Sequence, residues 1–388
     1  MIISFLKYLF KPKYPSLNRV VLRANNLLAN LAYLKSLQPT AEMFPVLKSN
    51  AYGHGLKEVC QILSQSAVSM VAVDSYPEAQ IAYRYFRGQV LIIGEMPLQA
   101  YRYCRLKRTE FVVYNEATLQ HLARYGKKAR IHLFVNSGMN REGIKNLPEF
   151  IERNRKYLEQ VSVTGLCSHL ASADEDSILN RNQAEEFSNS LDVLRQAGFF
   201  PRWVHLGNSA AIFNLKNKLL TAYRPGLSFY GYSPFLSGDG RLDPEAKTVL
   251  EQLRPALEVY SQIISLQDLK FGESVSYNET YRARGNVRVG VVPFGYFEGL
   301  DRRLSNQAEF LVKSSHGDFW AKIAGRVCMN LTCLDMDNRE ARLGTPVQIV
   351  SSQPDDKNSI INLASLSGLI PYELLVKIQA NIRREIKK

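Results

Sequence analysis

The feature that most constrains the fold is a repeat of short apolar and β-branched runs, each followed by a longer amphipathic stretch, from about residue 42 to residue 232. Such runs predict strands that alternate with helices. The strand candidates cover residues 42–47, 68–73, 90–93, 111–113, 131–135, 161–167, 203–206 and 227–230. Repeated strand and helix units build a parallel sheet, and eight of them predict an α/β fold, a (β/α)8 barrel of the TIM type.

The hydrophobic pattern changes near residue 245, where alternation with a period of two replaces the long amphipathic stretches. The alternating segments are 287–292, 310–313, 319–323 and 346–350, and helices are expected at 360–367 and 372–382. This pattern is typical of an antiparallel sheet. We therefore expect an N-terminal extension over residues 1–14, the barrel over 15–245, and a mainly antiparallel β domain over 246–388.

Composition narrows the class of protein. The chain of 388 residues has a formal charge of +13, but its basic residues are spread along the whole length, which argues against a nucleic-acid partner. Its five cysteines are scattered, without the spacing of a zinc site, so no metal is expected and a reducing, cytoplasmic location is favoured. The apolar first ten residues are too short to span a bilayer, so no integral membrane segment is expected.

One lysine ends the first predicted strand. Lys48 precedes a turn that contains Gly53 and Gly55. Burial disfavours an ammonium group, and a free amine can act as a base or as an imine-forming nucleophile. The alternative is an ordinary surface lysine whose stem alone is buried, which is the commoner case for a single lysine.

The barrel prediction gathers further polar residues at one face. Catalytic groups of such barrels lie beyond the carboxyl ends of the strands, and phosphate binds after strands seven and eight. Arg141 follows strand five, His169 follows strand six, Asn208 and Ser209 follow strand seven, and the segment 224–226 flanks strand eight.

Nine ordered motifs carry a family resemblance. They are KSNAYGHG at 48–55, GMNREG at 138–143, SHLASAD at 168–174, HLGNSAA at 205–211, RPG at 224–226, VSY at 275–277, GYFEG at 295–299, GRVCMN at 325–330 and PYE at 371–373. Together they resemble the alanine racemases, which are pyridoxal-phosphate enzymes with a barrel and a C-terminal β domain. The resemblance covers roughly residues 17–382.

The resemblance implies a two-base reaction on a cofactor imine. Lys48 would hold pyridoxal 5'-phosphate and act as the base on the D face. Tyr277 would be the base on the L face and would come from the other subunit of a head-to-tail homodimer. A free phenol has a pKa near ~10, so Tyr277 needs cationic neighbours to act near neutrality.

The remaining site residues are also implied by the resemblance. Arg224 would face the pyridine nitrogen of the cofactor, and His169 would orient Arg224 by a hydrogen bond. The rest are the phosphate ligands Tyr52, Ser209, Gly226 and Tyr372, the cofactor-pocket residue Asn208, and the substrate residues Arg141, Met329 and Tyr296.

Several positions depart from the family pattern. Phe134 stands where many alanine racemases carry a carbamylated lysine that fixes the arginine, and Asn136 and Asn330 replace frequent aspartates, while Glu298 lengthens another. We expect neutral partners such as Asn136 to hold Arg141 instead.

The resemblance implies an alanine racemase that interconverts L-alanine and D-alanine and supplies D-alanine for peptidoglycan. A broad-specificity or serine racemase of the same family is the alternative, because the departures lie around the substrate residues. A barrel decarboxylase for basic amino acids is less favoured, since those enzymes tend to place a carboxylate opposite the pyridine nitrogen. A single-domain cofactor carrier would lack the β domain.

Overall fold

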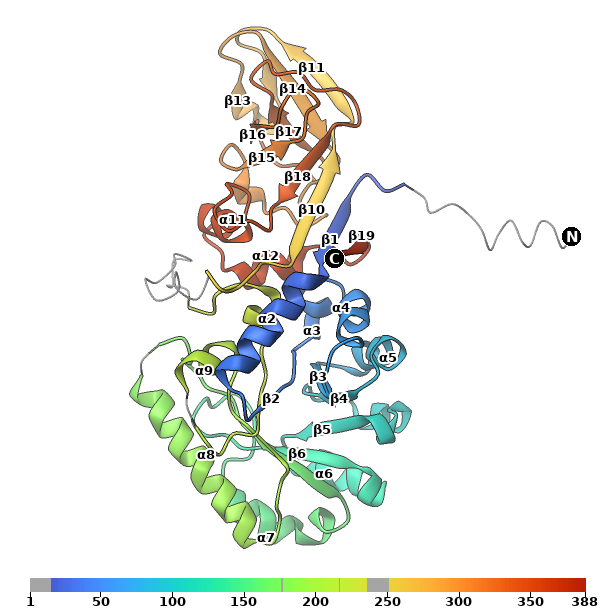
Figure 1. Cartoon of the computed structure of the whole chain (residues 1–388), viewed down its shortest axis with the longest axis vertical. Helices are drawn as coiled ribbons and strands as arrows, with labels where there is room; N and C mark the ends of the chain where they lie inside the picture. Colours follow the sequence, from blue (N-terminus) through green and yellow to red (C-terminus); the bar gives the residue numbers. More distant parts are fainter. Residues whose placement is uncertain (1–14, 176, 216, 236–250) are drawn as a thin grey trace, which may run out of the picture.

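The computed structural model describes residues 15–175, 177–215, 217–235 and 251–388, and Figure 1 shows a barrel at one end of the molecule and a β domain at the other. The strands of the barrel are β2 (Glu42–Met43), β3 (Met70–Val73), β4 (Gln89–Ile92), β5 (Thr109–Val113), β6 (Arg130–Phe134), β7 (Ser162–Cys167), β8 (Trp203–His205) and β9 (Ala222–Tyr223).

 Strands β3 to β8 form one parallel sheet, and β2 pairs with β9 in parallel. A bridge from Val46 to Ala72 joins the segment after β2 to β3, and the Thr221 amide donates to the Val204 carbonyl between β9 and β8. These links close the barrel and confirm the predicted fold class.

The last predicted barrel strand is wrong. Residues 227–230 form a 3₁₀ turn, Leu227–Tyr230, and the eighth strand is instead β9, five residues earlier. All four residues of the turn are buried, and a short apolar run buried on every side reads as a strand in the sequence. Arg224 and Gly226 therefore lie directly beyond the carboxyl end of β9, where a barrel carries its site.

Helices surround the barrel strands (Figure 1). They are α2 (Ala24–Leu37), α3 (Lys48–Tyr52), α4 (Leu56–Leu63), α5 (Tyr76–Tyr85), α6 (Glu116–Ala123), α7 (Leu147–Leu158), α8 (Ile178–Gln196) and α9 (Ser209–Asn214). After β4 the chain forms 3₁₀ turns at Leu98–Tyr103 and Leu106–Arg108 in place of a long helix. Asn115, Asn146, Ser177 and Asn208 each accept a backbone N–H bond and so cap α6, α7, α8 and α9.

The barrel interior is filled by side chains from strands β3 to β9 and from the segment that follows β2. The inner cluster contains Phe44, Val46, Met70, Ala72, Leu91, Val112, Phe134, Cys167, Trp203 and Ala222. A larger cluster lies between the strands and the helices and extends into the β domain. A packed interior leaves the ends of the strands as the place for a site in a barrel of this type.

The β domain is built on a sheet of nine strands in the order β11-β14-β17-β16-β15-β18-β10-β1-β19. Their bounds are β1 (Arg19–Arg23), β10 (Leu257–Gln262), β11 (Ser265–Leu269), β14 (Val287–Val292), β15 (Glu309–Val312), β16 (Phe319–Ile323), β17 (Thr332–Asp335), β18 (Pro346–Val350) and β19 (Arg383–Lys387). All neighbours are antiparallel except β1 and β19. A small hairpin, β12 (Ser274–Val275) with β13 (Tyr281–Arg282), precedes β14.

The alternating segments of the sequence are confirmed as strands of this sheet, and the predicted helix at 360–367 is α11 (Ile360–Ser367). The second predicted helix is too long, because α12 (Pro371–Lys377) ends before the chain turns into β19. Among the residues described, no single helix has the length and apolar composition needed to cross a membrane. Helices α11 and α12 pass that test only as a pair bent by 105°.

The first strand of the chain lies outside the barrel that was expected to begin at residue 15. Strand β1 pairs with β10 and β19 of the β domain, because its buried residues Val20, Val21 and Leu22 complete that sheet. The expected extension 1–14 and the expected boundary near residue 246 lie outside the described residues.

Candidate active site

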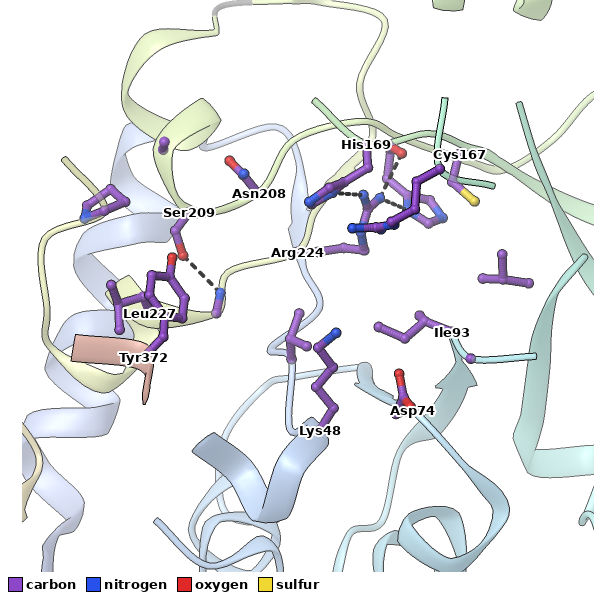
Figure 2. A pocket seen from close by; sticks show the side chains of 18 of the residues that line it. Lys48, Asp74, Ile93, Cys167, His169, Asn208, Ser209, Arg224, Leu227 and Tyr372 are labelled. Carbon is purple, nitrogen blue, oxygen red and sulfur yellow. Dashed lines mark hydrogen bonds between the residues drawn. The ribbon is translucent and has the colours of Figure 1, made fainter. Parts of the chain in front are cut away.

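A cavity of about 610 Å³ opens at the carboxyl ends of the barrel strands. Nine of the predicted site residues line it, namely Lys48, Tyr52, Arg141, His169, Asn208, Ser209, Arg224, Gly226 and Tyr372. Figure 2 shows Lys48 extending into the space between Ser209 and Tyr372 on one side and His169 and Cys167 on the other. The volume is in the range of small-ligand and cofactor sites.

Lys48 is held at the base of this cavity by a left-handed turn. The four residues Ser49–Tyr52 have φ angles between 53° and 55°, a conformation that costs roughly 1–2 kcal/mol for each residue that is not glycine. Asn50 Oδ1 accepts the Leu56 amide at 2.9 Å, which ties the turn to the start of α4. A strained turn persists only where its surroundings over-determine it, and here it directs the lysine side chain inward.

A group of hydroxyls and backbone amides occupies one side of the cavity. Ser209 Oγ accepts the amides of Gly226 at 2.9 Å and Ser228 at 3.2 Å. A Cβ at Gly226 would lie 2.6 Å from the Tyr52 hydroxyl, so only glycine fits there. Burial raises the pKa of Tyr52 and raises that of Tyr372 to about 12, which keeps both phenols protonated. Protonated hydroxyls beside backbone N–H groups suit an oxyanion such as a phosphate.

Arg224 occupies the other side of the cavity and is almost wholly buried. Its guanidinium donates to the carbonyls of Ser168 at 2.6 Å and His205 at 2.8 Å, and to His205 Nδ1. The contact with His169 Nδ1 is long, at 3.4 Å, so His205 rather than His169 is the main imidazole partner. Burial, with the nearby cations Arg224, Arg141 and Lys48, lowers the pKa of His169 to about 3, and the ring is therefore neutral.

The expectation for Arg141 is wrong. Its guanidinium donates to Glu142 Oε1 from Nη2 at 2.9 Å and from Nε at 3.3 Å. The oxygen of Asn136 instead accepts the amides of Gly138 and Asn140. The Asn136 side chain bonds to the backbone of its own turn, so the carboxylate of Glu142 is the available partner for Arg141.

The other departures from the family pattern also have partners. Phe134 packs against Tyr114 with ring centroids 4.8 Å apart, which leaves no polar group at that position. Asn330 Nδ2 donates to Glu298 Oε1 at 2.9 Å, and Glu298 Oε2 accepts the Gly295 amide at 2.8 Å. Two of the altered positions therefore bond to each other.

Three predicted site residues lie away from the cavity, on the β domain. Tyr277, Tyr296 and Met329 have exposed fractions of 62%, 44% and 56%. Tyr277 and Tyr296 line a separate hollow together with Asp301 and Lys377. A single chain thus does not bring Tyr277 to Lys48.

The sequence interpretation assigned no role to several residues that line the cavity. Besides His205, these are Asp74, Tyr114, Glu142, Cys167 and Asp174. His205 could have been found from its position at the end of a buried strand, two residues after the inward-facing Trp203. Asp74 follows β3 in the same way, directly after its last residue, Val73.

Comparison with known proteins agrees with this architecture. The family model for the alanine racemase N-terminal domain matches residues 22–234, and the model for the C-terminal domain matches residues 256–386. The chain is 30% identical over 377 residues to an alanine racemase of Borreliella burgdorferi, which covers 92% of this chain and 94% of that protein. It is 32% identical over 362 residues to an alanine racemase of Lactobacillus acidophilus, and this match covers 90% of this chain and 92% of that protein.

A solved structure gives the same result for the fold. The alanine racemase of Clostridium difficile 630 superposes with a TM-score of 0.85 at 27% identity and covers 97% of each chain. Both domains, their order and nearly their full length are therefore shared with these proteins. The chain belongs to the alanine racemase family.

Proposed function

We propose that this chain is a pyridoxal-phosphate-dependent alanine racemase that interconverts L-alanine and D-alanine. The observation that carries the proposal is the placement of Lys48 between the hydroxyl and amide group at Gly226 and the buried Arg224. Membership of the family and the names of its relatives point to the same reaction.

The residues of the cavity fit this cofactor. Ser209, Tyr52, Tyr372 and the Gly226 amide would hold the phosphate, where a Cβ would fill the space. Arg224 would meet the pyridine nitrogen, and a guanidinium does not readily give up its proton. When bound, pyridoxal phosphate supplies a conjugated system that stabilises negative charge at the Cα of the substrate.

Racemisation requires a base on each face of the substrate Cα. Lys48 would hold the cofactor and exchange the proton on the D face, and Tyr277 would exchange it on the L face. Arg141, positioned by Glu142, would bind near the substrate carboxylate. The backbone amide of Met329 would contact the same carboxylate, and Tyr296 would line the access channel.

A head-to-tail homodimer is part of this proposal. Tyr277, Tyr296 and Met329 are exposed on the β domain, and Tyr277 lines a hollow apart from the cavity of its own chain. A second copy that places this face over the barrel would deliver Tyr277 to the partner's lysine. The dimer would then be required for activity as well as for stability.

The proposed cellular role is the supply of D-alanine for peptidoglycan in the cytoplasm. All five cysteines of the chain are unpaired thiols, which is consistent with a reducing compartment. A broad-specificity or serine racemase is the second candidate, because Phe134 and Asn136 change the surroundings of Arg141.

The test is a panel of L-amino acids assayed for formation of the D-enantiomer by the purified protein with added pyridoxal phosphate. We expect alanine to be the best substrate and a cofactor absorbance band near ~420 nm that is lost in Lys48→Ala. A preference for serine would support the second candidate. If no amino acid of the panel were racemised although the cofactor band was normal, both candidate functions would be contradicted.

A further inference from the structure

A chain of polar side chains runs through the barrel interior behind Arg224. Arg224 bonds to His205 Nδ1, His205 Nε2 lies 2.7 Å from His132 Nδ1, and His132 Nε2 lies 2.8 Å from Glu110 Oε2. The four residues come from β5, β6, β8 and the end of β9, and both imidazoles are fully buried. The proposed function uses only the first member of this chain.

The direction of every hydrogen bond in the chain is fixed by chemistry. A guanidinium can only donate, so His205 Nδ1 must accept. An imidazole that accepts at one nitrogen carries its proton on the other, so His205 Nε2–H donates to His132 Nδ1. His132 then carries its proton on Nε2 and donates it to the Glu110 carboxylate. Both rings are therefore neutral, with the proton on Nε2.

The chain links a buried cation to a buried carboxylate. Among the described residues, the hydrogen-bond partners of the Arg224 guanidinium are carbonyls and imidazole nitrogens, and none is a carboxylate. Glu110 also accepts the Thr164 hydroxyl at 2.6 Å and lies 3.7 Å from Arg130. Burial raises the pKa of Glu110, but the bonds from His132 and Thr164 and the charge of Arg130 outweigh it, so the pKa is lowered and the group is ionised.

The packing of the barrel interior makes room for this series of hydrogen-bonded side chains. A Cβ at Gly165 of β7 would overlap the His132 ring, so glycine is required at this position. Burial, followed by the charge of Arg224, lowers the pKa of His205 well below its ordinary value, in agreement with a neutral ring.

We propose that Glu110 and His132, acting through His205, are positioning residues that hold Arg224 at the pyridine end of the cofactor site. This inference rests on the proposed function for its catalytic meaning, whereas the bond directions can be tested without cofactor. In Glu110→Gln the side-chain amide can donate to His132 Nε2, which favours the reversed tautomers and competes with Arg224 for the proton position on His205.

The first measurement is magic-angle-spinning NMR of the cofactor-stripped protein labelled with 15N-histidine, with signals assigned through His132→Gln and His205→Gln. We expect one protonated and one unprotonated nitrogen in each of the two rings, with the proton on Nε2. A proton on Nδ1 of either ring, or a doubly protonated ring, would overturn the proposal. The result of this NMR measurement does not depend on whether the protein is an alanine racemase.

The second measurement compares Glu110→Gln with a matched control, Glu258→Gln. Glu258 is an equally buried carboxylate paired with Arg23 in the β domain. We expect Glu110→Gln to show mixed tautomers at His132 and to lower kcat about tenfold with KM for L-alanine within about twofold. The control should leave kcat within about twofold of wild type. Equal kcat values for the two variants would overturn the proposal, whereas a wild-type protein without racemase activity would overturn only the proposed function.

Discussion

The two proposed bases can be separated at the level of single residues. Replacing Tyr277 by Phe removes the phenol and leaves Lys48 in place. We expect Tyr277→Phe to abolish exchange of the Cα proton of L-alanine with deuterated solvent and to leave slow exchange from D-alanine, because each base serves one face. The measurement is mass spectrometry of recovered alanine.

Tyr281 offers a matched control for that variant. Its hydroxyl donates to Asp335 at 2.6 Å within the β domain. Tyr281→Phe should therefore exchange both enantiomers at wild-type rates. Normal exchange from both enantiomers in Tyr277→Phe would remove Tyr277 from the reaction.

The contact of Arg141 with Glu142 leads to a second residue-scale prediction. Both side chains are more than a third exposed, so the ion pair stabilises the arginine by no more than about 1 kcal/mol. Glu142→Gln should raise KM for alanine about two- to fivefold and leave kcat nearly unchanged. Steady-state kinetics checks this, and a large fall in kcat with constant KM would contradict it.

The pairing of Arg141 with Glu142 also shows the limit of reading single residues from the sequence. The loss of the family lysine at Phe134 was visible, but its replacement partner depended on the local turn, in which the Asn136 oxygen is already used by two amides. Likewise His205 and Arg224 are 19 residues apart and meet only when the barrel closes. The residue types indicated which chemistry the site could perform, whereas the hydrogen-bond partners of Arg141 and Arg224 depended on contacts made only in the folded protein.

Secondary-structure elements far apart in the sequence support the lysine turn. Arg384 of β19 donates to the Gly53 carbonyl at 2.7 Å and to the His54 carbonyl at 3.1 Å. It also donates to the carbonyls of Ala380 and Ile382 near the end of its own domain. The strand at the end of the chain thus fixes the turn that follows Lys48.

Removal of this anchor gives the prediction at the scale of elements. Arg384→Met should lower the free energy of unfolding by about 2–3 kcal/mol, because charged donors to buried carbonyls are lost. It should also weaken cofactor binding, since the left-handed turn loses its restraint. Urea unfolding and cofactor titration measure the two effects. The control Lys387→Met changes an exposed cation on the same strand, and equal effects in the two variants would contradict the account.

The elements that the sequence predicted well are those with a clear period. Four strands of the β domain, β14, β15, β16 and β18, were found from their alternation, and seven of the barrel strands were located, whereas β10, β11 and β17 were not predicted. The eighth strand was misplaced because a buried 3₁₀ turn has the same composition as a buried strand. Strands β1 and β19 were missed because their sheet joins the two ends of the chain, which no local pattern records.

The molecule as a whole should lose stability in acid. His54 and His205 are fully buried, and burial lowers the pKa of His54 and of His169 to about 3 and that of His205 well below its ordinary value. Below about pH 6.5 the unfolded chain takes up protons that the folded chain does not. Each such histidine lowers the free energy of unfolding by about 1.4 kcal/mol per pH unit as the pH falls, and this contribution vanishes above pH 6.5.

Urea unfolding at pH 7.5, 6.0 and 5.0, at one protein concentration, measures this dependence. His54→Gln should reduce the slope below pH 6.5 by about one proton. Replacement of the exposed His316 by Gln serves as the control, and its slope should be closer to the wild-type slope than that of His54→Gln. A free energy of unfolding that stays constant from pH 7.5 to pH 5.0 would show that these rings titrate in the folded protein.

The proposed shared active site would be a property of the assembled dimer and not of one subunit. Lys48 lines the barrel cavity, whereas Tyr277 is exposed on the β domain and lines a different hollow. The most direct test mixes the inactive variants Lys48→Ala and Tyr277→Phe under conditions that allow subunits to exchange. One of the two sites of each mixed dimer then holds both native bases, so alanine racemisation should return to about one quarter of the wild-type rate. A mixture that stays as inactive as either variant alone would contradict a site built from two subunits.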